Sequence, residues 1–170
     1  NILKESVGSQ DQTFAAYGGF NYITFSKDGI EVRPVNISKS KLSELQSSLM
    51  LFFTGIARTA SEVASEQIKE MSNKITQMKD LCALTERAKF ILEHNTPINE
   101  FGELLGEEWK IKKSLSPIIS NPKIDEMGEI AIKNGAIGMK ICGAGSGGFM
   151  LLYVPEKYQN KVREVLKGYL

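Results

Sequence analysis

The sequence has little of what marks secreted, membrane-spanning or nucleic-acid-binding proteins. Among its 170 residues, 21 Lys and Arg residues almost balance 20 Asp and Glu residues, which leaves a formal net charge of +1. This charge gives no long-range field that would attract nucleic acid or an anionic membrane surface. No apolar run approaches the roughly 20 residues of a membrane-spanning helix, and no signal-peptide pattern opens the chain. We therefore expect no nucleic acid and no membrane among its partners.

Cysteine is also scarce, with only Cys82 and Cys142, and neither has metal-ligand spacing around it. We expect both to be buried free thiols of a protein in the reducing cytoplasm. The remaining composition, 42% hydrophobic and 24% charged, is that of a globular protein. The length suits one domain, or one domain and part of another. Because the chain opens with NILKESVG and lacks an initiator Met, we expect it to be a piece of a longer protein.

The distribution of apolar residues predicts a mixture of strands and helices. Two β-prone runs flank Asp28-Gly29, a pair that favours a hairpin with a type I′ turn. Asn95-Thr96-Pro97 separates two helices, with Thr96 able to cap the second and Pro97 able to occupy its first position. The predicted helices are 38–47, 61–73, a long helix from Ile75, one after Pro97, one from Asn121-Pro122 to Asn134-Gly135, and a closing helix from Pro155. The other predicted strands are 48–55, 136–141 and 149–154.

This order of elements predicts a two-layer α+β fold, in which helices pack on an antiparallel sheet. The opening hairpin gives way near Asn36 to a self-contained unit of strands and helices. We therefore expect a domain boundary there, with residues 1–36 and 37–170 on either side.

The segment Cys142–Gly148, CGAGSGG, is the most unusual part of the sequence. It satisfies the pattern G-x-G-x-x-G, but a dinucleotide-binding loop leads into a helix, whereas here the apolar strand FMLLYV follows. The other signatures of protein kinases and of P-loop proteins are absent. One interpretation is that the missing Cβ atoms let backbone N–H groups approach a phosphate or a neighbouring loop. The alternative, a tight hairpin, needs one or two glycines rather than four, so we favour the functional interpretation.

A second candidate is Asp11, which lies between two glutamines in VGSQDQTFAAY (residues 7–17). An acid flanked by amides and small residues is poorly explained as a solubilising surface charge. Asp11 could cap the helix that follows it, which is a common role for aspartate. It could also be a catalytic carboxylate held at the start of that helix.

The two candidates together resemble the GHMP kinases, the family of galactokinase, homoserine kinase and mevalonate kinase. The resemblance rests on VGSQDQ near the start and KICGAGSGGFMLLYV near the end, in that order and at that spacing. Within the family it favours the D-glycero-D-manno-heptose 7-phosphate kinases, on the stretches LMLFFTGIARTASEVASEQ (49–67), EEWKIKKSLSPIIS (107–120) and IKNGAIGMKICGAGSGGF (132–149). One departure is Ser146, where many relatives have glycine.

The resemblance implies an ATP-dependent, Mg²⁺-requiring kinase with two lobes. Residues 1–36 would be the end of the first lobe, and 37–170 the complete ferredoxin-like second lobe. The phosphate-holding P-x-x-x-G-L-G-S-S-type loop of the first lobe is not in this sequence. Asp11 matches the family position that accepts or orients the proton of the substrate hydroxyl. Gly143, Ala144, Gly145, Ser146, Gly147 and Gly148 match the family's third motif, which packs against the phosphate loop. No acid stands out as a Mg²⁺ ligand.

The implied substrate is a sugar phosphate, with D-glycero-D-manno-heptose 7-phosphate, phosphorylated at its anomeric hydroxyl, as the first candidate. Arg58 could grip the phosphate with its planar guanidinium, and Lys140 and Lys113 are weaker candidates. Arg58 could equally pair with Glu62 on a helix. We expect His94 to cap a helix end rather than to catalyse. Trp109 suits a core position.

Other assignments remain open on the sequence alone. The chain could belong to a galactokinase-like or fucokinase-like member of the family, or it could be a non-catalytic α+β ligand-binding module. The oligomeric state is also open, with a homodimer as one candidate.

Overall fold

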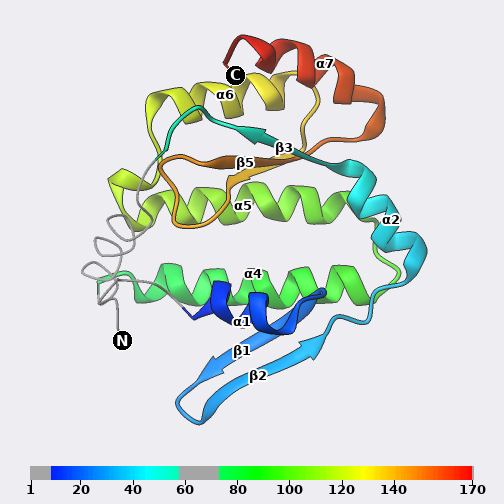
Figure 1. The fold of residues 1–170 in the computed structure, drawn as a ribbon, viewed down its shortest axis with the longest axis vertical. Coiled ribbons are helices and arrows are strands. Elements are labelled where there is room, and N and C mark those ends of the chain that lie inside the picture. Colours follow the sequence, from blue (N-terminus) through cyan, green and yellow to red (C-terminus); the bar gives the residue numbers. More distant parts are fainter. Residues whose placement is uncertain (1–8, 58–72, 170) are drawn as a thin grey trace.

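The computed structural model describes residues 9–57 and 73–169, and its elements confirm the α+β class (Figure 1). Most of the helix predicted over 61–73 lies outside the described residues. The helices and strands are α1 (Gln10–Tyr17), β1 (Asn21–Ser26), β2 (Gly29–Pro34), α2 (Lys39–Ser48), β3 (Leu49–Phe53), α4 (Ile75–Glu93), α5 (Asn99–Leu115), α6 (Pro122–Lys133), β4 (Gly138–Ile141), β5 (Phe149–Tyr153) and α7 (Glu156–Leu166), with 3₁₀ turns at Pro117–Ile119 and Lys167–Tyr169.

The strands form two separate antiparallel sheets. One is three-stranded, in the order β3-β5-β4, and the other is the hairpin β1-β2. Figure 1 shows α5 beneath the three-stranded sheet, then α4, and the hairpin beyond α4. The hairpin is tied to α4 by a hydrogen bond from the Tyr22 hydroxyl to Glu86. Just after the hairpin, the backbone N–H of Asn36 donates to Glu93 at 3.1 Å.

The hairpin exists as predicted, but its turn is one residue earlier than expected. Ser26 pairs with Gly29, so Lys27 and Asp28 form the two-residue connection. Neither of these two has a positive φ, while Gly29 has a φ of 135°. A type I′ turn needs positive φ at both central residues. The prediction of such a turn at Asp28-Gly29 was therefore wrong, because Gly29 is the first residue of β2.

The predicted start of α6 is confirmed, whereas that of α5 is wrong. The side-chain oxygen of Asn121 accepts a hydrogen bond from the N–H of Ile124 at 3.1 Å, and Pro122 occupies the first turn. In contrast, α5 begins at Asn99 and no side chain caps it. Thr96 and Pro97 lie before the helix, and the N-cap residue is Ile98, which is buried in the core.

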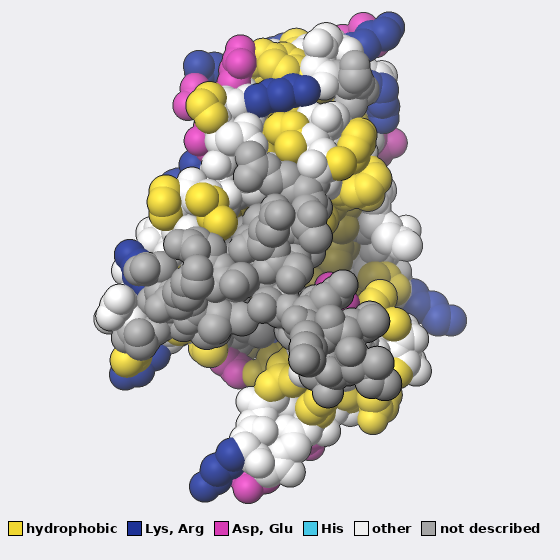
Figure 2. All heavy atoms as spheres, turned by 60° about the vertical axis from the view of Figure 1, so that its left-hand side comes forward, with side chains coloured by type: hydrophobic (Ala, Val, Ile, Leu, Met, Phe, Trp, Pro, Cys, Tyr) yellow, Lys and Arg dark blue, Asp and Glu magenta, His cyan; other side chains and the backbone are white. Residues whose placement is uncertain are grey.

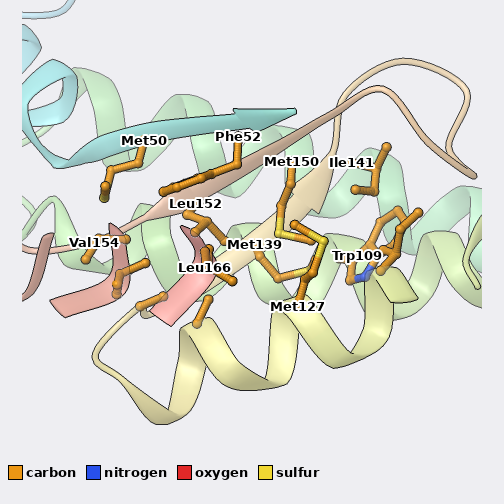
Figure 3. Close-up of a cluster of buried hydrophobic side chains, with 14 of the residues drawn as sticks. Met50, Phe52, Trp109, Met127, Met139, Ile141, Met150, Leu152, Val154 and Leu166 are labelled. Carbon is orange, nitrogen blue, oxygen red and sulfur yellow. The ribbon is translucent and has the colours of Figure 1, made fainter. Parts of the chain in front are cut away.

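Two hydrophobic clusters cover opposite faces of the three-stranded sheet. The first lies between the sheet and α6 and α7, and Figure 3 shows Met50, Phe52, Met150 and Leu152 directed from the strands towards Met127 and Leu166 on these helices. Trp109, from α5, joins this cluster, as the sequence predicted. The second lies against α4 and α5 around the fully buried Tyr153. In the described part of the chain, no helix is long and apolar enough to cross a membrane.

The helix α5 contacts β4 through glycines. A Cβ atom at Gly138 would lie 1.8 Å from the carbonyl oxygen of Gly102, and one at Gly102 would lie 2.6 Å from the ring of Tyr153. Gly106 also faces Gly138, with 3.7 Å between its ideal Cβ and the Gly138 Cα. The two backbones therefore approach more closely than any side chain would allow. This contact fixes the distance between α5 and the sheet and the register of the helix along β4.

We expect Gly138→Ala to lower the free energy of unfolding by about 3 kcal/mol or more, because the added methyl group would overlap backbone rather than a movable side chain. The matched control is Gly168→Ala, where a Cβ would meet nothing within 4 Å. The control should change stability by about 0.5 kcal/mol or less. Chemical denaturation followed by circular dichroism measures both. Equal midpoints for the two variants would contradict the close contact.

Candidate functional site

The glycine-rich loop between β4 and β5 is held by the backbones of two other segments. The N–H of Ser146 donates to the carbonyl of Ile119 at 2.6 Å, and the N–H of Gly148 donates to that of Ile56 at 2.8 Å. The carbonyl of Gly148 in turn accepts from the N–H and the hydroxyl of Thr54, both at 2.9 Å. Asn121 donates its side-chain amide to the carbonyl of Ser146 at 3.2 Å. The loop is thus a fixed structure.

The conformation of the loop explains its glycines. Gly143, Gly145 and Gly148 have φ values of 74°, 111° and 78°, and Ser146 has a φ of 66°. Ser146 is the one non-glycine residue with positive φ in the described ranges, so its departure from the family pattern places an L residue in a strained region. At Gly145 a Cβ would also lie 2.8 Å from the Ile119 carbonyl oxygen. At Gly147 it would lie 2.6 Å from that of Ile56.

Part of the loop nevertheless remains open to a ligand. At Gly143 and Gly148 a Cβ atom would meet nothing within 4 Å. The N–H groups of Gly143, Gly145 and Gly147 have no acceptor among the residues that the structure describes. Of these three residues Gly143 is exposed and Gly147 is buried, so open space adjoins the unpaired N–H at the start of the loop.

Two lysines lie where β4 runs into this loop. Lys140, on β4, forms an ion pair with Glu108 of α5 at 3.0 Å, and the two side chains are 26% and 19% exposed. Lys112, one turn after Glu108 on α5, donates to the carbonyl of Gly143 at 2.5 Å. Desolvation lowers the pKa of Lys112, and repulsion from Lys140 lowers it further, while Glu108 raises it. The structure thus places Lys140 beside the loop and adds Glu108 and Lys112, which the sequence interpretation missed.

The sequence did contain a signal for these two residues. Glu108 and Lys112 are four residues apart, a spacing that places an acid and a base on one face of a helix. Lys113, which the sequence interpretation named as a weaker phosphate-binding candidate, pairs with Asp125 of α6 at 2.8 Å.

Both cysteines are free, but the prediction that they are buried was wrong, because Cys82 and Cys142 are exposed. Cys142 is the first residue after β4, on the same side as the two lysines. Desolvation raises the pKa of its thiol, and Lys140 and Lys112 act in the opposite direction. A thiol at this position responds to the charge of both lysines.

Asp11 lies in the first turn of α1 and is exposed. The N-cap residue is Ser9, so Asp11 does not have the capping role that the sequence left open. Asp11 forms no hydrogen bond or ion pair with any described residue, and the structure does not connect it to the glycine loop. Arg58 lies outside the described residues. His94 ends α4, with its ring stacked on Phe90 at 4.1 Å and its Nδ1 3.0 Å from the Phe90 carbonyl oxygen, as expected for a helix end.

The exposed apolar residues near the loop form a second feature of this end of the sheet. Phe53 and Phe149, at the ends of β3 and β5, pack together with their ring centroids 5.3 Å apart, yet they are 45% and 48% exposed. Leu51 on the same face is also exposed. Figure 2, which brings the left side of Figure 1 forward, shows hydrophobic side chains at several places on this surface.

Two hollows lie away from the loop. One, of about 700 Å³, lies between α5 and α6, where Lys113 and Asp125 pair. The other, of about 530 Å³, lies between α2 and the end of α4. In this hollow the ammonium of Lys41 donates to the carbonyls of Ile91, His94 and Thr96. The positive charge that favours the C-terminal end of α4 is thus supplied by Lys41. Within the described ranges, no group of three or more His, Cys, Asp or Glu residues could hold a metal ion.

Comparison with known proteins agrees with this geometry. Residues 88–170 match the family model described as GHMP kinases C terminal. The chain is 32% identical, over 96% of its length, to D-glycero-alpha-D-manno-heptose 7-phosphate kinase of Campylobacter jejuni, and it covers 50% of that protein. It is 30% identical, over 94% of its length, to the bifunctional fucokinase/GDP-fucose pyrophosphorylase of Arabidopsis thaliana, and it covers 16% of that protein.

Among solved structures, the chain resembles a D-glycero-D-manno-heptose 1-phosphate kinase from Bacteroides thetaiotaomicron. The TM-score is 0.64 at 26% identity, over 99% of this chain and 45% of that one. The fold and the loop thus agree with the C-terminal domain that the family model describes. Residues 88–170 carry the C-terminal domain of the GHMP kinase family, and the chain as a whole is similar to members of that family. It spans half the length, or less, of these relatives.

Alanine substitutions in the loop should separate backbone strain from crowding. Gly143→Ala adds strain alone and should cost about 1 kcal/mol of folding free energy. Gly145→Ala adds strain and a 2.8 Å contact with the Ile119 carbonyl, and should cost about 2–4 kcal/mol. Denaturant titration of both variants measures the difference. Equal losses would show that the loop is not held against Ile119 as described.

Proposed function

We propose that this chain is part of an ATP-dependent kinase that phosphorylates a sugar phosphate. D-glycero-D-manno-heptose 7-phosphate, phosphorylated at its anomeric hydroxyl, is the first candidate. The observation that carries this proposal is the 32% identity, over 96% of the chain, to a heptose 7-phosphate kinase. Free thiols at Cys82 and Cys142 support a cytoplasmic location.

The roles that we assign to single residues are part of this proposal. The glycine loop would present the N–H groups of Gly143, Gly145 and Gly147 to the phosphates or to the adjoining phosphate loop. Ala144, Ser146 and Gly148 would maintain the shape of the loop. Residues 1–36 would belong with the first lobe and residues 37–170 with the second. ATP supplies the phosphoryl group when it is bound, and Mg²⁺ would accompany it, although no described residue is assigned to the metal.

Phosphoryl transfer depends mainly on positioning and on stabilising charge. Asp11 would accept or orient the proton of the substrate hydroxyl while that oxygen attacks the γ-phosphorus. Lys140, and Arg58 with its planar guanidinium, would bind the phosphate of the substrate. The exposed Asp11 carboxylate, without a partner in the described chain, supports a role towards a ligand or another part of the protein.

A second candidate substrate is a sugar without phosphate. The 30% identity to a fucokinase-containing protein supports it. The protein extended to the length of its heptose kinase relatives should therefore be supplied with ATP and with heptose 7-phosphate, fucose or galactose in turn. Our proposal predicts the highest kcat/KM for heptose 7-phosphate. A preference for fucose or galactose would overturn the substrate assignment, and no transfer to any sugar would favour a non-catalytic module.

In the extended protein, Asp11→Asn should reduce kcat by about 10²–10⁴-fold, which is the usual contribution of a general base. KM for ATP should change little, because the carboxylate acts on the substrate hydroxyl. Steady-state kinetics measures both constants.

The matched control is Asp28→Asn, which removes an exposed carboxylate from the hairpin turn. It should leave kcat within about twofold of the unmodified protein, since a surface substitution away from the site changes little. If Asp11→Asn retains the kcat of the control, Asp11 is not the base.

A further inference from the structure

The junction of β4 with the glycine loop contains more positive charge than the protein neutralises. Lys112 is partly desolvated, the Lys140 side chain is 26% exposed, and both lysines lie close enough to Cys142 to act on its thiol. Glu108 supplies one negative charge, through the 3.0 Å ion pair with Lys140. The second carboxylate oxygen of Glu108 is buried and has no hydrogen-bond partner among the described residues. One positive charge remains uncompensated in a partly buried place, which is costly without an anion.

Both ammonium groups also have donors to spare. A lysine ammonium carries three N–H donors. Lys112 uses one on the carbonyl of Gly143, and Lys140 uses one on Glu108. Gly143 is exposed, and open space adjoins its Cα on the side where a side chain would be. The free donors of the two lysines therefore lie beside accessible space at the start of the loop.

We propose that Lys112 and Lys140 together bind a phosphate group at the start of the glycine loop. A phosphate monoester carries close to two negative charges at neutral pH and three strong acceptor oxygens, which match two ammonium groups with spare donors. This deepens the proposed function, on which the identity of the ligand rests. The phosphate could come from a phosphorylated sugar or from the nucleotide. Lys113 is not part of the site, because Asp125 holds it on the other side of α5.

The chain contains a reporter for this site and an internal reference. Cys142 is exposed beside the two lysines, whereas Cys82 is exposed on α4. The thiolate is the form of cysteine that reacts with iodoacetamide, and nearby positive charge increases its proportion. Phosphate bound by Lys112 and Lys140 would neutralise that charge and cover the thiol. It should therefore slow alkylation of Cys142 and leave Cys82 unaffected.

The test is the rate of alkylation at each cysteine of the 170-residue chain, read by peptide mass spectrometry. Inorganic phosphate, glucose 6-phosphate and ATP are titrated separately, with ionic strength kept constant by KCl. We expect a saturable slowing at Cys142 alone. Stronger protection by glucose 6-phosphate than by ATP would assign the site to the sugar's phosphate, and the reverse order would assign it to the nucleotide. No change at Cys142, or equal slowing at Cys82, overturns the proposal.

Variants then identify the groups responsible. Lys112→Gln and Lys140→Gln should each raise the phosphate concentration for half-maximal protection about tenfold or more, the usual effect of losing a charge-assisted hydrogen bond. Lys110→Gln is the matched control, since Lys110 is exposed on the same helix and should leave protection unchanged. An effect of Lys110→Gln equal to those of the other two would reduce the site to a general charge effect and overturn it.

The assay is independent of catalysis. Phosphate protection without transfer in the extended protein would leave this site standing and reject the kinase proposal. Phosphoryl transfer by the extended protein without protection of Cys142 would reject this site and leave the kinase proposal standing. The wild-type titration decides the matter even if a lysine variant does not fold, because it requires no substitution.

Discussion

The contact between α5 and β4 determines the rest of the candidate site. Helix and strand touch backbone to backbone because Gly102 and Gly138 have no side chains, and a Cβ at Gly138 would lie 1.8 Å from a carbonyl oxygen. That contact sets α5 over β4 at a fixed register. Further along α5, Glu108 consequently reaches Lys140, and Lys112, one turn later, reaches the carbonyl of Gly143. A bulkier residue at the contact would lift the helix and separate these charges.

The glycine loop provides the shape of the candidate site, and the two lysines Lys112 and Lys140 provide its charge. The loop is clamped to Ile56 and Ile119 through the N–H groups of Gly148 and Ser146, so these donors are not free for a ligand. The loop therefore provides rigid backbone and a few aimed N–H groups. In our proposal, the attraction for an anion comes mainly from Lys112 and Lys140, which α5 and β4 place at the edge of the loop.

The hairpin at the start of the chain is separate from this arrangement. It forms its own two-stranded sheet and contacts α4 through Tyr22, on the side away from the three-stranded sheet. Asp11, just before it, is exposed and unpaired within the described residues. We propose that residues 1–36 belong with another lobe. The Asp11 carboxylate has no partner among the described residues of 37–169, which agrees with this proposal.

Local sequence signals determined the α+β class, the strands, α6 with its Asn121 cap, and the glycine loop, because each depends on neighbouring residues. The motifs also indicated the family. Long-range packing decided the rest. The pairing of β1 with β2 places the turn at Lys27 and Asp28, and α5 starts at Asn99, after the buried N-cap residue Ile98. The sequence interpretation named Lys113 as a candidate and missed the adjacent Lys112. Neighbouring helix residues face different directions, so the packing of α5 on Gly138 decides which lysine reaches the loop. In this packing Lys112 reaches the loop and Lys113 pairs with Asp125.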